Sequence, residues 1–123
     1  MDRFKGKLNR NHGKELLGFH FNGREYEVRC TEHSLERFKG SNIDVDAALG
    51  SIVALGKTRL DYFSSQGADV AIIDKEHHIS TIITFESEDN YTQIRIATII
   101  PRDRIFVKAG TKVFCLHDYR GGF

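Results

Sequence analysis

The chain has 123 residues, of which 40% are hydrophobic and 28% charged, and its formal net charge is +1. A chain of this length corresponds to one domain and buries about two thirds of its unfolded surface, which is enough for an ordinary core. These values exclude a two-domain architecture and a chain that is disordered by default. No signal peptide and no run of roughly 18 apolar residues is present, so we expect a soluble cytoplasmic protein without a membrane partner.

The charges are distributed unevenly along the chain. Residues 1–30 carry seven Lys or Arg and four Asp or Glu, residues 31–91 carry five and eleven, and residues 92–112 carry five and one. If segments of like charge also gather in space, one face of a nearly neutral molecule becomes positive and attracts a polyanion. The alternative is that segments of opposite charge lie side by side and cancel.

The N-terminal part of the chain divides into an arm and a hairpin. Residues 1–18 show little periodicity and several cations, and we interpret them as a flexible basic arm. Residues 19–123 are predicted to form a single α+β domain. The domain begins with a β-hairpin, because Asn22-Gly23 supplies the two positive φ angles of a type I′ turn. The residues expected on one face of this hairpin are Tyr26, Val28 and Cys30.

Two helices are predicted after the hairpin. The first lies between Thr31, whose side chain can cap it, and Gly40, where it stops. The second is expected to start near Asp44 and to continue for about five turns, ending before Gly67, because apolar residues recur at steps of three and four.

Beyond residue 67 the apolar period changes to two, which predicts four β-strands separated by polar turns. The strands are expected at residues 70–73, 79–85, 92–100 and 112–116, with a bend or a brief extra strand at 105–107. Short connections favour antiparallel neighbours. The sequence therefore predicts an α+β fold, in which an N-terminal hairpin and two helices pack on one face of a four-stranded or larger antiparallel sheet.

The strand at 92–100 presents two sets of side chains on opposite faces. Alternation places Ile94, Ile96, Thr98 and Ile100 on one face, and Gln93, Arg95, Ala97 and Ile99 on the other. If the helices cover only one face, Arg95 stands on the open face, where cations of the following loop converge with it. The nucleic-acid-binding residues predicted in this way are Arg95, Arg102, Arg104, Lys108 and Lys112.

Such a cluster suits phosphate chemistry. Guanidinium groups match phosphate oxygens with a planar fork of donors, and fixed cations stabilise the charge that grows on a phosphodiester during transfer. The alternative is a solvated sheet edge, whose arginines pair with the acidic side chains of residues 86–89.

His33 and Arg37 lie four residues apart in the first predicted helix, so they share one face of it. An imidazole can move a proton to or from a ribose 2′-hydroxyl or a leaving 5′-oxygen near neutral pH, while a neighbouring cation holds the phosphate. These two residues are therefore a candidate acid–base group and phosphate anchor. The alternative is a pair of inert surface side chains.

The sequence predicts no metal site and no cofactor. His77-His78 lies in a turn beside acidic residues, but adjacent turn residues seldom point the same way, and no third ligand follows at a suitable spacing. Cys30 and Cys115 match no metal spacing and are expected as buried free thiols. No glycine-rich phosphate loop and no nucleophile motif is present.

The segment Thr31-Glu32-His33-Ser34-Leu35-Glu36-Arg37-Phe38 resembles the T-x-H-x-x-x-R helix of small bacterial and phage toxin-like domains. These domains are grouped with RelE/ParE-like toxins and with barnase-, EndoU- and colicin-type ribonucleases. The segments 94–101 and 106–113 are similar to their closing strands. The resemblance implies one or two helices packed on an antiparallel sheet of about four strands.

The resemblance also implies an activity, namely metal-independent cleavage of RNA, in which the 2′-hydroxyl attacks its own phosphate and no cofactor takes part. On this chain it implies that His33 transfers a proton and that Arg37 and Arg95 bind the scissile phosphate. Thr98 or Lys108 would assist orientation.

Three functional hypotheses follow. The first is a toxin-like endoribonuclease that acts on RNA and has a cognate antitoxin or immunity protein as a partner. Its predicted catalytic residues are His33, Arg37, Arg95 and Thr98. The second is a non-catalytic phage or mobile-element module that binds a host protein or nucleic acid. The third is an immunity-type inhibitor that uses the acidic residues 31–91 against a basic partner.

Overall fold

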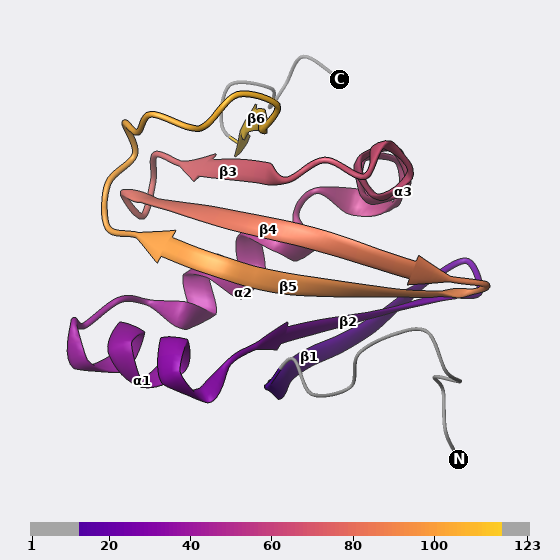
Figure 1. Cartoon of the computed structure of the whole chain (residues 1–123), viewed down its shortest axis with the longest axis horizontal. Helices are drawn as coiled ribbons and strands as arrows, with labels where there is room; N and C mark the ends of the chain where they lie inside the picture. Colours follow the sequence, from indigo (N-terminus) through magenta and orange to yellow (C-terminus); the bar gives the residue numbers. More distant parts are fainter. Residues whose placement is uncertain (1–12, 117–123) are drawn as a thin grey trace.

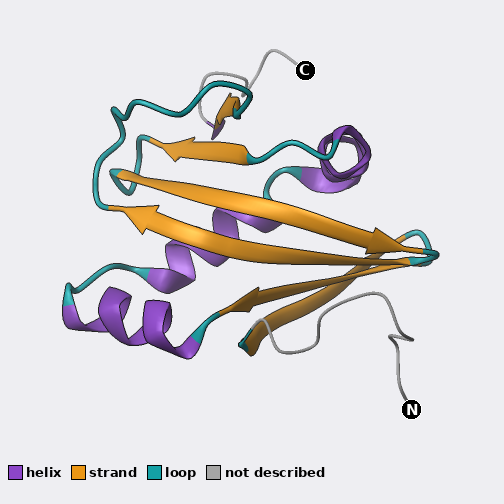
Figure 2. Ribbon diagram, in the orientation of Figure 1, coloured by secondary structure: helices purple, strands orange, loops and turns teal. Residues whose placement is uncertain are grey.

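A six-stranded sheet with the order β1-β2-β5-β4-β3-β6 lies at the centre of the computed structural model, which describes residues 13–116 (Figures 1 and 2). The strands are β1 (Lys14–Phe21), β2 (Arg24–Cys30), β3 (Val70–Asp74), β4 (Ile79–Glu88), β5 (Tyr91–Ile100) and β6 (Lys112–Cys115). The helices are α1 (Glu32–Gly40), α2 (Val45–Val53) and α3 (Gly56–Gln66). The predicted α+β class is confirmed.

The sheet is mixed. The pairs β1–β2, β3–β4 and β4–β5 are antiparallel, whereas β2 runs parallel to β5 and β6 runs parallel to β3. The predicted wholly antiparallel sheet is therefore wrong: the turns after β3 and β4 join antiparallel neighbours as expected, but the connection 101–111 does not, because it carries β6 to the far side of β3. The parallel pairs arise because residues 31–69 and the loop 101–111 are long enough to carry the chain across the sheet before the next strand begins.

The helices pack against one face of this sheet. α2 contacts β3 and β4 and lies behind β4 and β5 in Figure 1, while α3 contacts β4. Two buried side chains of α1, Leu35 and Phe38, join the same core. The sheet contributes fully buried residues to it, including Tyr26, Val28, Ile72, Ile83 and Ile94. Because burial of each large apolar side chain is worth about 1.5–3 kcal/mol, this core holds the helices against the sheet.

A β-bulge interrupts β5. In the register between β4 and β5, Ile83 lies opposite Ile96 and Ile82 lies opposite Thr98, so Ala97 has no partner on β4. An extra residue of this kind reverses the side on which all later side chains of the strand point.

The bulge corrects the predicted faces of β5. Ile99, which is 3% exposed, belongs to the core, and Thr98 turns to the opposite face. The assignment of Thr98 to the face of Ile94 is therefore wrong, because it assumed strict alternation. Thr98 instead shares the helix-free face with Arg95, since their partners on β4, Ile82 and Thr84, are themselves two residues apart.

The predicted continuous second helix is also wrong, since the chain forms α2 and α3 in its place. Gly56 has a φ of +80°, which is outside the range of a right-handed helix. The chain therefore changes direction at this residue. The apolar pattern did not reveal the break because buried Leu55 and Leu60 continue the helical spacing across it.

We expect Gly56→Ala to lower the free energy of unfolding by about 1–2 kcal/mol, because a Cβ is strained at positive φ. In a continuous helix the same change would raise it by roughly 1 kcal/mol. Gly50→Ala in α2 is the matched control: a Cβ at position 50 meets no atom within 4 Å. This variant should gain about 0.5–1 kcal/mol in urea unfolding. Stabilisation by Gly56→Ala would contradict the break.

The structure also tests four smaller predictions, which concern the hairpin turn, the N-terminal arm, residues 105–107 and the cysteines. Asn22 and Gly23 have φ angles of +46° and +85°, which confirms the predicted turn. β1 begins at Lys14, so residues 14–18 are part of the hairpin, while residues 1–12 of the expected arm lie outside the described residues. Residues 105–107 form no strand. Cys30 and Cys115 are free thiols, the first buried and the second half-buried.

Within residues 13–116, none of the helices combines the length and the apolar character that a membrane crossing requires.

Candidate functional site

Arg95 lies on the helix-free face of the sheet, between Arg29 of β2 and Thr84 of β4. Arg29 is paired with the carboxylate of Glu27 at 3.1 Å, and this carboxylate also accepts a hydrogen bond from the hydroxyl of Tyr91. Arg95 is half-buried and has no carboxylate partner among the described residues. Two arginines therefore lie side by side, and only one of them is neutralised.

α1 presents His33 and Arg37 to solvent. The hydroxyl of Thr31 accepts a hydrogen bond from the backbone nitrogen of Ser34 at 3.1 Å, so the predicted cap is confirmed. The apolar side of the helix faces the core, which leaves the side chains of His33 and Arg37 exposed. The helical spacing that predicted a shared face for this pair is thus present.

Arg37 also lies near the end of β2. Its guanidinium carbon is 5.6 Å from the centre of the Phe38 ring. Burial raises the pKa of the Cys30 thiol, and the positive charge of Arg37 partly opposes this rise. Cys30 directly follows Arg29, the strand partner of Arg95. Among the described residues, no hydrogen bond or ion pair joins His33 or Arg37 to Arg95, and Cys30 and Arg29 point to opposite faces of β2.

The remaining predicted cations lie farther away. Arg102, Arg104 and Lys108 are exposed in the loop between β5 and β6, and Lys112 begins β6. β4 and β3 separate β5 from β6. Three strand spacings of about 4.8 Å therefore put Lys112 roughly 14 Å from β5. Lys112 therefore does not lie beside Arg95. The predicted site residues fall into separate groups, which are His33 with Arg37 on α1, Arg95 with Thr98 on the sheet face, and Arg102, Arg104 and Lys108 in the loop after β5.

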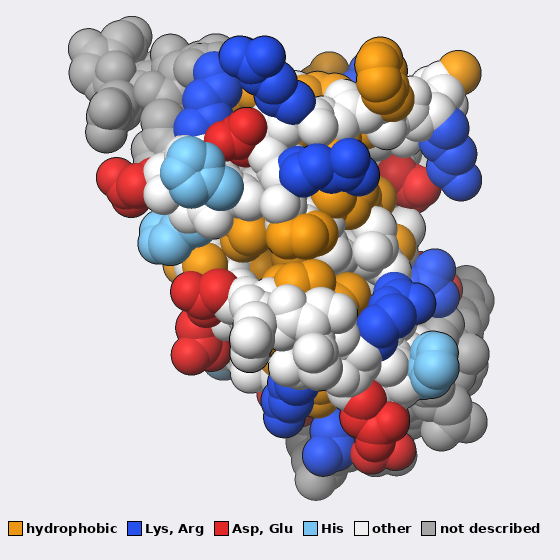
Figure 3. Space-filling model, turned by 90° about the vertical axis from the view of Figure 1, so that its left-hand side faces the viewer, with side chains coloured by type: hydrophobic (Ala, Val, Ile, Leu, Met, Phe, Trp, Pro, Cys, Tyr) orange, Lys and Arg blue, Asp and Glu red, His pale blue; other side chains and the backbone are white. Residues whose placement is uncertain are grey.

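These cations share one property. None of the predicted cations forms an ion pair with a carboxylate within residues 13–116. These cations are Arg37, Arg95, Arg102, Arg104, Lys108 and Lys112. Lys14, Arg29 and Lys57, in contrast, pair with Glu32, Glu27 and Asp61. In the described part of the chain, Arg95, Arg102 and Arg104 form no ion pair with the acids of residues 86–89, which was the expected alternative. Figure 3 shows Lys and Arg side chains at several separate places on one end of the molecule, with an apolar band between them.

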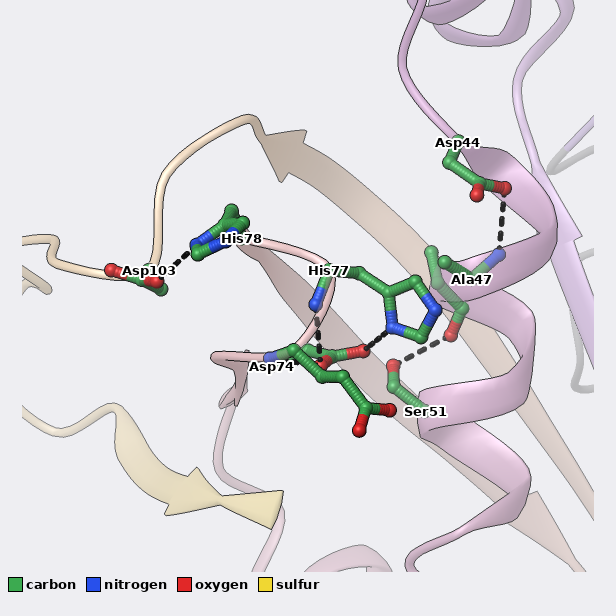
Figure 4. Close-up of polar contacts among 9 residues, drawn as sticks. Asp44, Ala47, Ser51, Asp74, His77, His78 and Asp103 are labelled. Carbon is green, nitrogen blue, oxygen red and sulfur yellow. Dashed lines mark hydrogen bonds and ion pairs between the residues drawn. The ribbon is translucent and has the colours of Figure 1, made fainter. Parts of the chain in front are cut away.

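A second polar cluster, which the sequence reasoning missed as a unit, lies in the turn between β3 and β4. Asp74 is 3% exposed, and its Oδ1 accepts hydrogen bonds from the backbone nitrogens of Glu76 and His77 at 3.0 and 3.1 Å. Its Oδ2 lies 2.8 Å from His77 Nδ1 (Figure 4). The hydrogen bond and the charge of Asp74 raise the pKa of His77 above its usual value.

A cavity of about 470 Å³ opens between this turn and α2. It is lined by Asp44, Asp46, Ala47, Gly50, Ser51, Ala54, Asp74, His77 and Leu116. The side chains that α2 contributes beyond its first turn are small, which leaves the space open, and His77 directs its ring toward this helix (Figure 4). The recurrence of small residues at positions 47, 50, 51 and 54, together with the Asp-x-x-His spacing, is the sequence signal that could have revealed the cavity.

The adjacent residues His77 and His78 form hydrogen bonds with different carboxylates. His78 Nδ1 lies 2.9 Å from Asp103 Oδ2 in the loop after β5, whereas His77 is held by Asp74 (Figure 4). In the part of the chain that the structure describes, no three His, Cys, Asp or Glu side chains are arranged to hold a metal ion.

No protein-family model, curated protein or solved structure matches this chain. The resemblance to toxin-like ribonucleases therefore depends only on the short segments 31–38, 94–101 and 106–113, and the function that it implies is a proposal.

We expect Asp74→Asn to lower the pKa of His77, because the neutral amide keeps an acceptor oxygen for the turn but removes the charge that favours imidazolium. Because the pKa of His77 is higher in the folded than in the unfolded protein, its protonation stabilises the fold. This contribution is fully present at a pH below the pKa of the unfolded state, and it is lost as the pH rises through the pKa of the folded state. NMR titration of the imidazole measures the change. Asp103→Asn, which touches His78, is the control. An unaltered His77 titration in Asp74→Asn would contradict the assignment.

Proposed function

We propose that this protein is a toxin-like, metal-independent endoribonuclease that binds RNA phosphates through Arg95, Arg37 and the cations of the loop after β5. The observation that carries the proposal is that these cations have no carboxylate partner within residues 13–116. An unneutralised guanidinium on a sheet face without helices presents its planar fork of donors to phosphate oxygens.

The proposed reaction needs proton transfer and charge stabilisation, and the chain has a residue for each. The ribose 2′-hydroxyl attacks the adjacent phosphorus, and the bond to the 5′-oxygen of the next nucleotide breaks. The exposed imidazole of His33 takes the proton from the attacking hydroxyl or gives one to the leaving oxygen. Arg37 and Arg95 stabilise the charge on the non-bridging oxygens. Thr98 lies on the face of Arg95 because of the bulge, and it orients the phosphate.

A second candidate is a non-catalytic module that binds nucleic acid through the same cations. The observation that favours it is the division of the predicted site, since His33 and Arg95 belong to different elements and no hydrogen bond joins them among the described residues. Both candidates bind RNA, and only the first cleaves it. In either case the proposal places the protein in the cytoplasm with RNA, and an antitoxin or immunity protein is a further partner of the first candidate.

Incubation of the purified protein with total RNA in EDTA tests the proposal. We expect cleavage that the chelator does not prevent. Binding without cleavage would reject the enzyme and support the second candidate. A protein that neither binds nor cleaves RNA would reject both.

A further inference from the structure

Phe106, in the loop between β5 and β6, has the most exposed large apolar side chain among residues 13–116. Its relative exposure is 104%, compared with 53% for Tyr62 and 51% for Val113. A phenyl ring in water contributes no burial energy to the fold, so folding gives no reason for this residue at this place.

The residues around Phe106 alternate between two environments. Arg104, Phe106 and Lys108 are exposed, while Ile105 and Val107 are half-buried. In an extended chain, residues two apart point to the same side and lie roughly 6.6 Å from one another. The segment therefore presents one aromatic ring with a cation on either side of it.

Polar contacts hold this segment at both ends. Before it, the hydroxyl of Ser80 donates to the carbonyl of Arg102 at 2.7 Å, and His78 contacts Asp103. After it, the backbone nitrogen of Thr111 donates to the carbonyl of Lys108 at 3.2 Å, which closes a turn before β6. These anchors reduce the conformational entropy that the segment would lose on binding a ligand.

We propose that residues 104–108 contact single-stranded RNA, with a base stacked on Phe106 and the flanking phosphates bound by Arg104 and Lys108. This inference rests on the proposed function and adds a specific contact to it. Bases that are not paired stack on aromatic side chains, and lysine and arginine follow the phosphate backbone on either side. Because every base has a π-face, this contact adds affinity without selecting a sequence.

The test measures affinity by fluorescence anisotropy for two polyanions, one with bases and one without. The first probe is a labelled 2′-O-methyl oligouridine, which lacks the hydroxyl that cleavage needs, and the second is inorganic polyphosphate used as a competitor. We expect Phe106→Ala to raise the Kd for the oligonucleotide roughly 5- to 150-fold and to leave polyphosphate binding unchanged. Phe106→Trp should restore the affinity, whereas Phe106→Leu should not.

Two further variants complete the design. Replacing Arg104 or Lys108 by glutamine should weaken the binding of both probes and reduce the salt dependence of oligonucleotide binding by about one unit of slope. Tyr62→Ala, which removes another exposed aromatic ring from α3, is the matched control and should bind like the wild type. Circular dichroism confirms that each variant is folded.

The outcomes separate this inference from the proposed function. Unchanged oligonucleotide affinity in Phe106→Ala, with weaker binding by Arg95→Gln, would reject base stacking and keep RNA as the ligand; Phe106 would then be free to anchor a protein partner. Equal weakening for both probes would also reject stacking, because the ring would only hold the loop in place. A wild-type protein that binds neither probe would reject the inference and the proposed function together.

Discussion

His33→Ala is expected to reduce RNA cleavage by about two orders of magnitude or more, while RNA affinity stays within roughly twofold of the wild type. The reason is that the imidazole transfers a proton and contributes little to binding, which the unpaired cations provide. Its side chain is exposed on α1 and lies outside the core, so removal leaves the fold intact. Single-turnover cleavage in EDTA and anisotropy with a 2′-O-methyl oligonucleotide measure the two quantities separately.

Two comparisons make this experiment decisive. His20→Ala removes another exposed histidine, on β1, and should cleave at the wild-type rate. Arg95→Gln should lose both cleavage and affinity, because its guanidinium is expected to bind the phosphate in the ground state and in the transition state. If His33→Ala cleaves RNA as fast as His20→Ala, the assignment of proton transfer to α1 is wrong.

Glu27→Ala is expected to lower the free energy of unfolding by about 2–4 kcal/mol, because it removes the carboxylate partner of the half-buried Arg29, which keeps only its hydrogen bond to the Gly13 carbonyl. Glu27 is 2% exposed, and the side chain of Arg29 is 16% exposed. The substitution also removes the acceptor of the Tyr91 hydroxyl, which is itself in a buried residue. Urea denaturation followed by circular dichroism measures the loss.

A double variant shows how much of the lost free energy of unfolding comes from the unpaired charge of Arg29 and how much from the missing side chain of Glu27. Glu27→Leu combined with Arg29→Met replaces the buried pair by apolar groups of similar volume, and it should recover most of the stability. A loss below about 1 kcal/mol in Glu27→Ala would show that the pair is hydrated and is not a buried ion pair.

Much of the fold was predictable because short-range chemistry dictates it. Asn22-Gly23 forms the turn of the hairpin, Thr31 caps α1 and Asp44 caps α2, each through the backbone geometry or side-chain acceptor that its residue type supplies. The strands after residue 67 follow from a period of two in β-branched residues. None of these features requires knowledge of a distant segment.

The errors concern single residues that alter the geometry without altering the apolar pattern. Ala97 forms a bulge and Gly56 adopts a positive φ, and in both places the hydrophobic spacing continues as if nothing had changed. A bulge depends on the register with the neighbouring strand, so the sequence of β5 alone does not specify it. The bulge is also what places Thr98 on the face of Arg95.

For the candidate site, the sequence by itself determined which groups can bind phosphate and which imidazole shares a helix face with a cation, because residue type and helical spacing are local properties. Only the tertiary structure decided which of these groups are neutralised. Arg29 and Arg95 are both arginines in strands of alternating apolar and polar residues, and the sequence does not distinguish them. In the structure Glu27 pairs with Arg29 and not with Arg95. The physical reason is that an ion pair needs two side chains at one place and on one face, and strand register together with strand order sets that place.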